Sequence, residues 1–256
     1  FTMTLKRNIQ KKAEGYVDLS LPSGTKWAKC NLGAERETDY GHYYMWGSII
    51  PNTPDECTWE NAPLNGGRKE FNLLYFDYNK SRWLDNEDNL KPEYDAAYQA
   101  TGGVAHMPTA KQFKELKNNT IRKWVTIDGV SGYKFISKTN GNSIFFPICG
   151  YYDNGGVYLR ESYSSTSSGS YWSSSRRESD FSNEALSLHF NLGYVNSYSS
   201  CPHKYGFCIR PVMDTIKINL EEQCLWYCWY NILSSRFPSA SKSWVVNEVN
   251  KIVYKK

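Results

Sequence analysis

The sequence has no CxxC pair among its seven cysteines, which argues against a zinc ribbon and a thioredoxin-like site. It also has no HExxH motif and no nucleophile-elbow pattern, so two common catalytic signatures are missing. No apolar run is long enough to span a bilayer, because the longest, near residues 225–233, covers only about ten residues and includes Asn231. These absences exclude an integral membrane helix and disfavour metal chemistry.

Strong charge of either sign is also absent. The formal net charge is +4, and Lys and Arg form no stripe along the chain. A nucleic-acid-binding protein normally shows clustered basic residues and a higher isoelectric point. The odd number of cysteines leaves at least one unpaired thiol in a monomer, and we expect most of them to be buried free cysteines.

Aromatic residues are abundant instead. They make up 16% of the chain, with 20 Tyr and 9 Trp, while the mean hydropathy is −0.61. Aromatic mass with little aliphatic mass is typical of many short strands and a tyrosine-rich surface. The 256 residues have room for one large domain or two small ones. The start of the chain has neither Met nor a signal-peptide pattern, so we expect any targeting segment to lie outside it.

Local patterns predict both helices and strands. Residues 16–28 alternate around a Pro-Ser-Gly turn and predict a β-hairpin. Residues 40–46 form a second strand-like run, and residues 51–92, rich in Pro, Asn, Asp and Gly, are expected to form an irregular surface loop. Thr109 and Gln112 form a capping box, which predicts a helix through Leu116, and a second helix is expected over residues 92–99.

Strand signals return in the second half, at residues 133–137, 143–148, 185–190 and 207–212. Two helices followed by many strands predict an α+β domain. We expect residues 1–13 to be a lead-in segment, residues 14–213 to form the domain, and residues 214–256 to be a C-terminal appendage. The appendage is either a packing element or an interaction segment.

The composition changes between Lys138 and Lys204. These 65 residues contain no Lys, Gln or Met, and 15 of the 48 residues from Tyr158 to Tyr205 are Ser. One interpretation is a serine-rich loop region of a β-domain. The other is a recognition surface, because Tyr, Ser, Asn and Gly combine rigid contact area with adaptable hydrogen bonding. Apolar residues such as Trp172 and Phe190 occur throughout the segment, so we expect it to fold.

Several motifs occur in the order found in one protein family. They are Tyr16-Val17-Asp18-Leu19 with Trp27-Ala28, Tyr40-Gly41-His42 with Trp46-Gly47, His106-Met107-Pro108-Thr109, Gly132-Tyr133-Lys134, Asn140-Gly141-Asn142, Tyr171-Trp172-Ser173-Ser174-Ser175 and Gly206-Phe207-Cys208-Ile209-Arg210-Pro211-Val212. Over residues 14–213 the sequence therefore resembles the Fibrobacter succinogenes major paralogous domain, which is common in Bacteroidetes surface proteins. That family is related to the formylglycine-generating-enzyme-like branch of the C-type lectin fold.

The resemblance implies an α+β C-type lectin fold, with two helices, short and mostly antiparallel strands, and long loops. The same fold carries the variable proteins of diversity-generating retroelements, found in bacteria, archaea and phages. Residues 150–212 look like such a variable region, because randomised AAY codons cannot encode Lys, Gln or Met. Glu161, Glu178 and Glu184 do not fit that mechanism and should be fixed positions.

Within this region the resemblance separates scaffold from display. The scaffold residues are Trp172, Ser173, Phe207 and Arg210, with Trp172 filling the core beneath the loops and Arg210 pairing with a buried carboxylate or with backbone carbonyls. The display candidates lie between these anchors. They are Leu159, Arg160, Tyr163, Arg176, Arg177, Ser179, Asp180, Ser182, Asn183, Leu192, Tyr194, Asn196, Tyr198, Ser200, His203 and Tyr205.

The implied function is ligand or receptor recognition by a diversified surface, with a protein or glycan partner on another cell or surface, at the cell surface or on a phage tail. The alternative is a non-diversified adhesin domain with a fixed partner. We expect no enzymatic activity, no cofactor and no metal site. Enzymes of this fold bind copper through a cysteine pair, and the setting of Cys201 and Cys208 does not match their motif.

Overall fold

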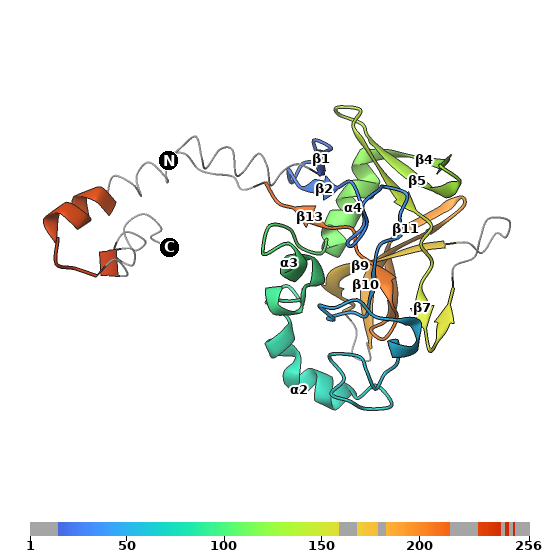
Figure 1. Ribbon diagram of the computed structural model, residues 1–256, viewed down its shortest axis with the longest axis horizontal. Coiled ribbons are helices and arrows are strands. Elements are labelled where there is room, and N and C mark those ends of the chain that lie inside the picture. Colours follow the sequence, from blue (N-terminus) through green and yellow to red (C-terminus); the bar gives the residue numbers. More distant parts are fainter. Residues whose placement is uncertain are drawn as a thin grey trace. The chain divides into compact units, whose positions relative to one another are not determined.

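The computed structural model describes residues 15–158, 168–178, 183–215, 230–241, 244, 245 and 248 (Figure 1). The chain divides into two compact units, residues 1–214 and residues 215–256. The expected α+β C-type lectin fold with two helices is wrong. The described residues of the first unit form thirteen strands in four sheets and three α-helices, so this unit is mostly β.

The largest sheet has five strands and contains most of the serine-rich segment. In spatial order it consists of β11 (Tyr194–Pro202), β10 (Glu184–Asn191), β9 (Ser168–Arg176), β12 (Phe207–Cys208) and β3 (Tyr43–Tyr44). Neighbours are antiparallel except β9 and β12, which pair in parallel through Tyr171 and Cys208. The interpretation of residues 158–205 as a loop region was therefore wrong for β9 and β11, whereas the strand predicted at residues 185–190 is present as β10.

The strands β9 and β10 of this sheet are buried on both faces, which explains their sequence pattern. Side chains alternate between the faces of a strand, and Tyr171 packs in one apolar cluster while its neighbour Trp172 packs in another. The serines of β9 fit between large side chains, and Ser170, Ser173 and Ser174 are buried. A strand buried on both sides loses the simple alternation of apolar and polar residues. A serine-rich sequence without that alternation is easily mistaken for the sequence of a loop.

Three smaller sheets complete the first unit. They are β1 (Tyr16–Asp18), β2 (Lys26–Ala28) and β13 (Val212–Met213); β4 (Thr120–Ile127), β5 (Val130–Ser137) and β6 (Ser143–Pro147); and β7 (Tyr152–Asp153) with β8 (Gly156–Val157). The predicted hairpin of residues 16–28 is present as β1 and β2, with Tyr16 opposite Ala28. The run at residues 40–46 is shorter than expected, since only Tyr43 and Tyr44 are in a strand.

The helices are η1 (Pro54–Glu56), α2 (Leu73–Trp83), η2 (Pro92–Tyr94), α3 (Ala96–Ala100) and α4 (Ala110–Asn119). The capping box of α4 is present, because Thr109 Oγ1 accepts from the Gln112 N–H at 3.2 Å while Gln112 Oε1 accepts from the Thr109 N–H at 2.8 Å. The second predicted helix is split into η2 and α3.

The expected irregular loop at residues 51–92 contains α2. The Asn72 side chain caps this helix by accepting from the Tyr75 N–H at 2.8 Å, and the helix buries Phe76 and Trp83. Its many polar residues lie on the exposed face, so a loop-like composition concealed an anchored helix.

In the second unit, residues 230–236 are helical and the Phe237 ring packs edge-on against Trp244 at 5.4 Å. Among the residues that the structure describes, no helix is long and apolar enough to cross a membrane.

Candidate ligand-binding surface

The β10–β11 hairpin presents the most exposed of the predicted display residues. Leu192, at its two-residue turn, is 66% exposed, and Tyr194 and Tyr198 on β11 are 52% and 58% exposed. Gly193 completes the turn with a φ of 88°, and its N–H donates to the Tyr133 hydroxyl at 3.1 Å. Because β11 is the edge strand of a sheet buried elsewhere, these three side chains project from a fixed scaffold.

The other display candidates are in varied surroundings. Arg177 donates to the Ser200 Oγ at 2.8 Å and pairs with Glu184, so it links β9, β10 and β11. Asn196 accepts from the Tyr198 N–H at 3.0 Å, and Asn183 is half-buried, its carbonyl accepting from the His203 N–H at 3.0 Å. Six candidates lie outside the described residues, namely Leu159, Arg160, Tyr163, Ser179, Asp180 and Ser182.

Three display candidates turn inward, and for them the expectation needs correction. His203 is only 2% exposed and stacks on Trp46 with ring centroids 4.5 Å apart. Tyr205 is half-buried and stacks on Tyr151 at 5.5 Å. The Arg176 side chain is 10% exposed, and its guanidinium lies 4.0 Å from Asp88. Their polar side chains are typical of surface positions, but residues from distant parts of the chain cover them.

Burial of His203 predicts a pH-dependent stability. Desolvation lowers the pKa of His203 to about 3, so the folded state keeps this imidazole neutral where the unfolded chain, with a pKa of about 6.5, takes up a proton. The contribution is present above pH 6.5 and is lost as the pH falls. We expect the free energy of unfolding to fall by up to about 1.4 kcal/mol per pH unit more in the wild type than in His203→Phe. Parallel urea-unfolding profiles between pH 7 and pH 4 would contradict this.

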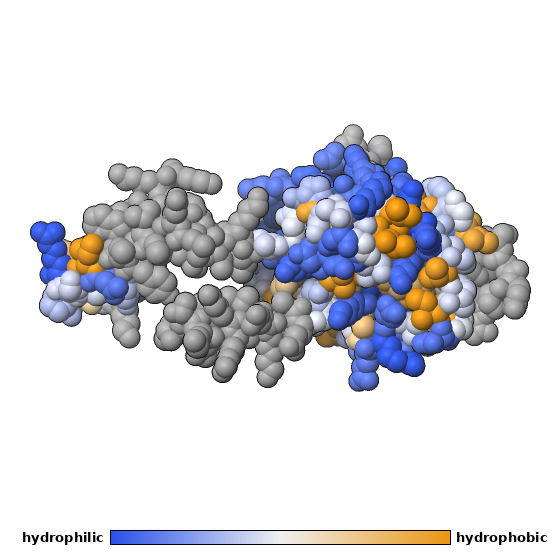
Figure 2. Space-filling model, turned by 90° about the horizontal axis from the view of Figure 1, so that it is seen from above, coloured by the Kyte–Doolittle hydropathy of each residue, from blue (hydrophilic) through white to orange (hydrophobic). Residues whose placement is uncertain are grey.

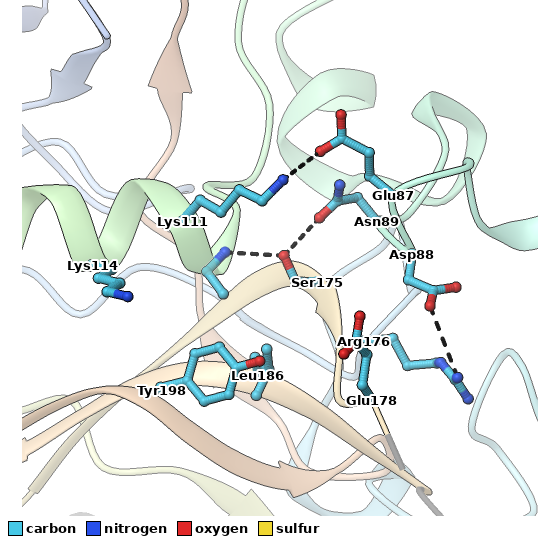
Figure 3. A pocket seen from close by; sticks show the side chains of 11 residues that line it. Glu87, Asp88, Asn89, Lys111, Lys114, Ser175, Arg176, Glu178, Leu186 and Tyr198 are labelled. Atoms are coloured by element: carbon cyan, nitrogen blue, oxygen red, sulfur yellow. Dashed lines mark hydrogen bonds and ion pairs between the residues drawn. The ribbon is translucent and has the colours of Figure 1, made fainter. Parts of the chain in front are cut away.

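Beside Tyr198, the surface is hollowed into a pocket of about 190 Å³ (Figure 3). Ser175, near the end of β9, lines this pocket and hydrogen-bonds to the two segments beside it. The Ser175 Oγ accepts from the Ala110 N–H at the start of α4, at 3.0 Å, and donates to the Asn89 Oδ1 at 2.6 Å. Leu186 of β10 supplies an apolar wall. Strand, helix and loop are thereby locked together around the opening.

The rim of the pocket carries balanced charge. Lys111 pairs with Glu87 at 2.8 Å and Arg176 lies at 4.0 Å from Asp88, whereas Lys114 and Glu178 have no ion pair within the described ranges. Three cationic and three anionic side chains line the opening, so the pocket favours an uncharged polar group with both donors and acceptors over a strongly charged ion. Its volume is below the roughly 300–1,000 Å³ of pockets for drug-sized ligands. It accepts one small group.

Sequence reasoning missed most of this pocket. Glu87, Lys111 and Lys114 lie outside residues 150–212, where the display candidates were sought. The sequence predicted the helix that carries Lys111 and Lys114, but only the tertiary structure brings these residues beside Tyr198. On the face that Figure 2 shows, apolar residues form separate patches among hydrophilic ones.

The scaffold residues lie beneath this surface. Trp172 is fully buried, stacks on Phe207 at 4.2 Å, and donates from its indole N–H to the Tyr44 carbonyl at 2.8 Å. Ser173 is also fully buried, and its hydroxyl donates to the Leu186 carbonyl at 2.7 Å. These bonds connect β9 to β3 on one side and to β10 on the other.

Arg210 is fully buried and pairs with no carboxylate among the residues that the structure describes. It donates to the backbone carbonyls of Ala28 at 3.1 Å, Lys29 at 2.7 Å and Phe145 at 2.8 Å, and its Nε donates to the Asn31 Oδ1 at 2.8 Å. The backbone-carbonyl alternative is therefore the one observed. Desolvation lowers the pKa of this guanidinium.

Cys201 and Cys208, whose setting does not match the copper-binding motif, do not form a pair. Cys201 lies on β11 and Cys208 on β12, and β10 and β9 separate these two strands. Cys208 instead donates from its thiol to the Tyr40 carbonyl at 3.2 Å, and Cys149 donates to the Ser170 carbonyl at 3.6 Å, with both side chains fully buried. Among the described residues no group of three or more His, Cys, Asp or Glu side chains could hold a metal ion.

A family model described as a domain of unknown function (DUF8237) matches residues 112–212. The matched segment runs from the first turn of α4 to β13 and includes β9, the β10–β11 hairpin and Arg210. No curated protein and no solved structure matches the chain.

Proposed function

We propose that this protein is a recognition protein that binds a ligand through the β10–β11 hairpin and the adjoining pocket. The observation that carries the proposal is the separation of roles along β9–β11. Trp172, Ser173 and Leu188 are buried and hydrogen-bonded or packed, while Tyr194 and Tyr198 project from the edge strand. Such a scaffold tolerates changes at the displayed positions, because the buried anchors hold the stability.

The chemistry of the displayed residues supports binding over catalysis. Tyrosine supplies a large amphipathic contact area with little conformational entropy to lose, and it is enriched among energetic hot spots. The pocket beside Tyr198 adds paired charges and the Asn89 amide, which suit hydroxyl or amide groups of a glycan or a peptide. We place this function at a cell or phage surface, in line with the resemblance in sequence.

Replacing Tyr198 with alanine tests the proposal. We expect at least about 2 kcal/mol loss of binding free energy, a roughly 30-fold weaker Kd, for a side chain that closes the pocket. The free energy of unfolding should change by less than about 0.5 kcal/mol, because the ring is 58% exposed. Tyr194→Ala should weaken binding less, since Tyr194 is not part of the pocket lining.

A matched control is Tyr78→Ala on α2, where the ring is 87% exposed and distant in sequence from the hairpin. Titration of ligands identified on a glycan or peptide array, together with urea unfolding, provides the two readouts. Equal losses of binding and stability in Tyr198→Ala, or equal weakening by Tyr78→Ala, would contradict the assignment.

Diversification is a separate part of the proposal. If residues 150–212 are rewritten by a retroelement, sequencing the locus across a population of cells should reveal a near-copy of these codons beside a reverse transcriptase gene. The two copies would differ only where the unchanged one has adenines. An invariant gene without such a copy would instead support the alternative, a fixed-specificity adhesin domain.

A further inference from the structure

The β4–β5 hairpin lies in a different sheet from the proposed ligand-binding surface and has an open edge. β4 is the outer strand of the order β4-β5-β6, and in the described part of the chain no strand pairs with its other side (Figure 1). The β4–β5 register runs from Thr120 opposite Ser137 to Ile127 opposite Val130 without a shift. A long, regular edge strand presents a row of unpaired backbone groups, which is a template for another strand.

The hairpin geometry determines which backbone groups point outward. Asp128 and Gly129, with φ of 48° and 81°, make a two-residue turn, so the flanking pair Ile127 and Val130 is hydrogen-bonded. Bonding then alternates along the strand. The β4 residues whose backbone N–H and C=O groups point away from β5 are therefore Arg122, Trp124 and Thr126, called the outward residues below.

The hydrogen bonds between β5 and β6 agree with this alternation of backbone bonding. The Ile148 N–H donates to the Ser131 carbonyl at 3.0 Å, and the Ser137 N–H donates to the Asn142 carbonyl at 2.8 Å. The backbone N–H and C=O groups of odd-numbered β5 residues thus point toward β6, and those of even-numbered β5 residues point toward β4. Three consecutive outward residues of β4 leave up to six backbone hydrogen bonds open to a partner strand.

The side chains along this edge carry unpaired positive charge. Lys123 lies directly opposite Lys134 on the same face of the hairpin, and Arg122 is adjacent. None of the three takes part in an ion pair with any residue that the structure describes. Like charges directly opposite each other are destabilising, and an acidic residue on an added strand would relieve that repulsion.

The same charges disfavour a second copy of this chain as the occupant. Antiparallel pairing of two β4 strands would bring Arg122 and Lys123 of both copies within one or two residue pairs of each other. Edge lysines are a recognised device against such self-pairing. Ile121, 50% exposed on the same face as Lys123, gives the partner an apolar contact next to the charges.

We propose that the β4 edge is a docking site for an extended acidic segment of another protein, which adds to the β4-β5-β6 sheet as a further strand. Backbone bonds to Arg122, Trp124 and Thr126 supply affinity, and acidic side chains opposite Lys123 supply selectivity. A residue opposite Lys123 on the added strand would form a non-hydrogen-bonded pair, in which side chains are closest.

The first test uses two capped eight-residue peptides, one alternating Glu and Thr and the other alternating Lys and Thr, with the full chain. We expect the Glu peptide to bind at least about tenfold more tightly at low salt, with the difference shrinking at 1 M salt, where the screening length is about 3 Å. Residue-resolved hydrogen exchange should show new protection at the amides of Arg122, Trp124 and Thr126. The amides of Lys123 and Val125, already bonded to β5, should change little.

Charge reversal provides the second test. Lys123→Glu with Lys134→Glu should reverse the preference toward the Lys peptide, and Lys123→Gln with Lys134→Gln should weaken the preference without reversing it. The matched control is Lys69→Glu with Lys80→Glu, which changes the net charge equally at exposed positions on other elements. Equal binding of both peptides, or binding without protection of the three outward amides, would overturn the proposal. So would protection of these amides that rises with protein concentration alone, because the occupant would then be a second copy.

Discussion

Replacing Trp172 with alanine is expected to cost about 3–5 kcal/mol of unfolding free energy, the range for large-to-small changes of a buried aromatic. The ring is fully buried and stacks on Phe207, so its removal opens a cavity between β9 and β12. It also leaves the Tyr44 carbonyl without the indole donor at 2.8 Å. Urea unfolding of the wild type and Trp172→Ala measures the loss directly.

A pair of milder variants isolates the hydrogen bond. Trp27 is also fully buried, but its indole nitrogen has no hydrogen-bond partner within the described structure. Trp172→Phe should therefore cost about 1–3 kcal/mol more than Trp27→Phe, because only the former leaves a buried carbonyl unsatisfied. Equal costs would show that ring packing alone holds Trp172 in place.

Arg210 gives the second large effect. Arg210→Met keeps much of the side-chain volume but removes the donors to the carbonyls of Ala28, Lys29 and Phe145 and to Asn31. Several buried acceptors then lose their partners at once, each costing about 1–3 kcal/mol. The buried guanidinium also carries a desolvation penalty, which is absent in the Met variant. We therefore expect a net loss of about 3–5 kcal/mol of unfolding free energy.

The control for Arg210 is Arg177→Met. Arg177 pairs with Glu184 at the surface and its side chain is 47% exposed, so this change should cost less than about 1 kcal/mol. Arg210→Lys should fall between the two, since a lysine keeps the charge but cannot reach all four acceptors in the fork geometry. An Arg210→Met protein as stable as Arg177→Met would contradict a structural role for the buried guanidinium.

Elements built from short-range contacts could be predicted from the sequence. The α4 capping box spans three residues, and the β1–β2 hairpin closes around the Leu21 to Gly24 turn bond of 2.8 Å. Both depend on bonds between neighbours in the chain, which leave a local signature. The burial of Trp172 was predicted as well, from the resemblance of the motif at residues 171–175.

The α+β prediction was wrong for a physical reason. The signal for an exposed or half-buried strand is alternation, and β9 has little of it because neighbours cover both of its faces. Its serines find partners inside the protein, since Ser173 donates to the Leu186 carbonyl and Ser175 donates to the Asn89 side chain. The helix α2 was missed for the opposite reason, since its polar face dominated the composition of residues 51–92.

By itself, the sequence determined the β1–β2 hairpin, the cap of α4 and the buried anchors Trp172, Ser173 and Phe207 in residues 150–212. Only the tertiary structure decided which polar residues face solvent. His203, Tyr205 and Arg176 are covered by Trp46, Tyr151 and Asp88, residues from distant parts of the chain. Likewise Ser175, Asn89 and α4 meet at the pocket only because β9 pairs with strands far away in sequence. Local periodicity records how a segment folds, whereas exposure depends on which remote segment packs against it.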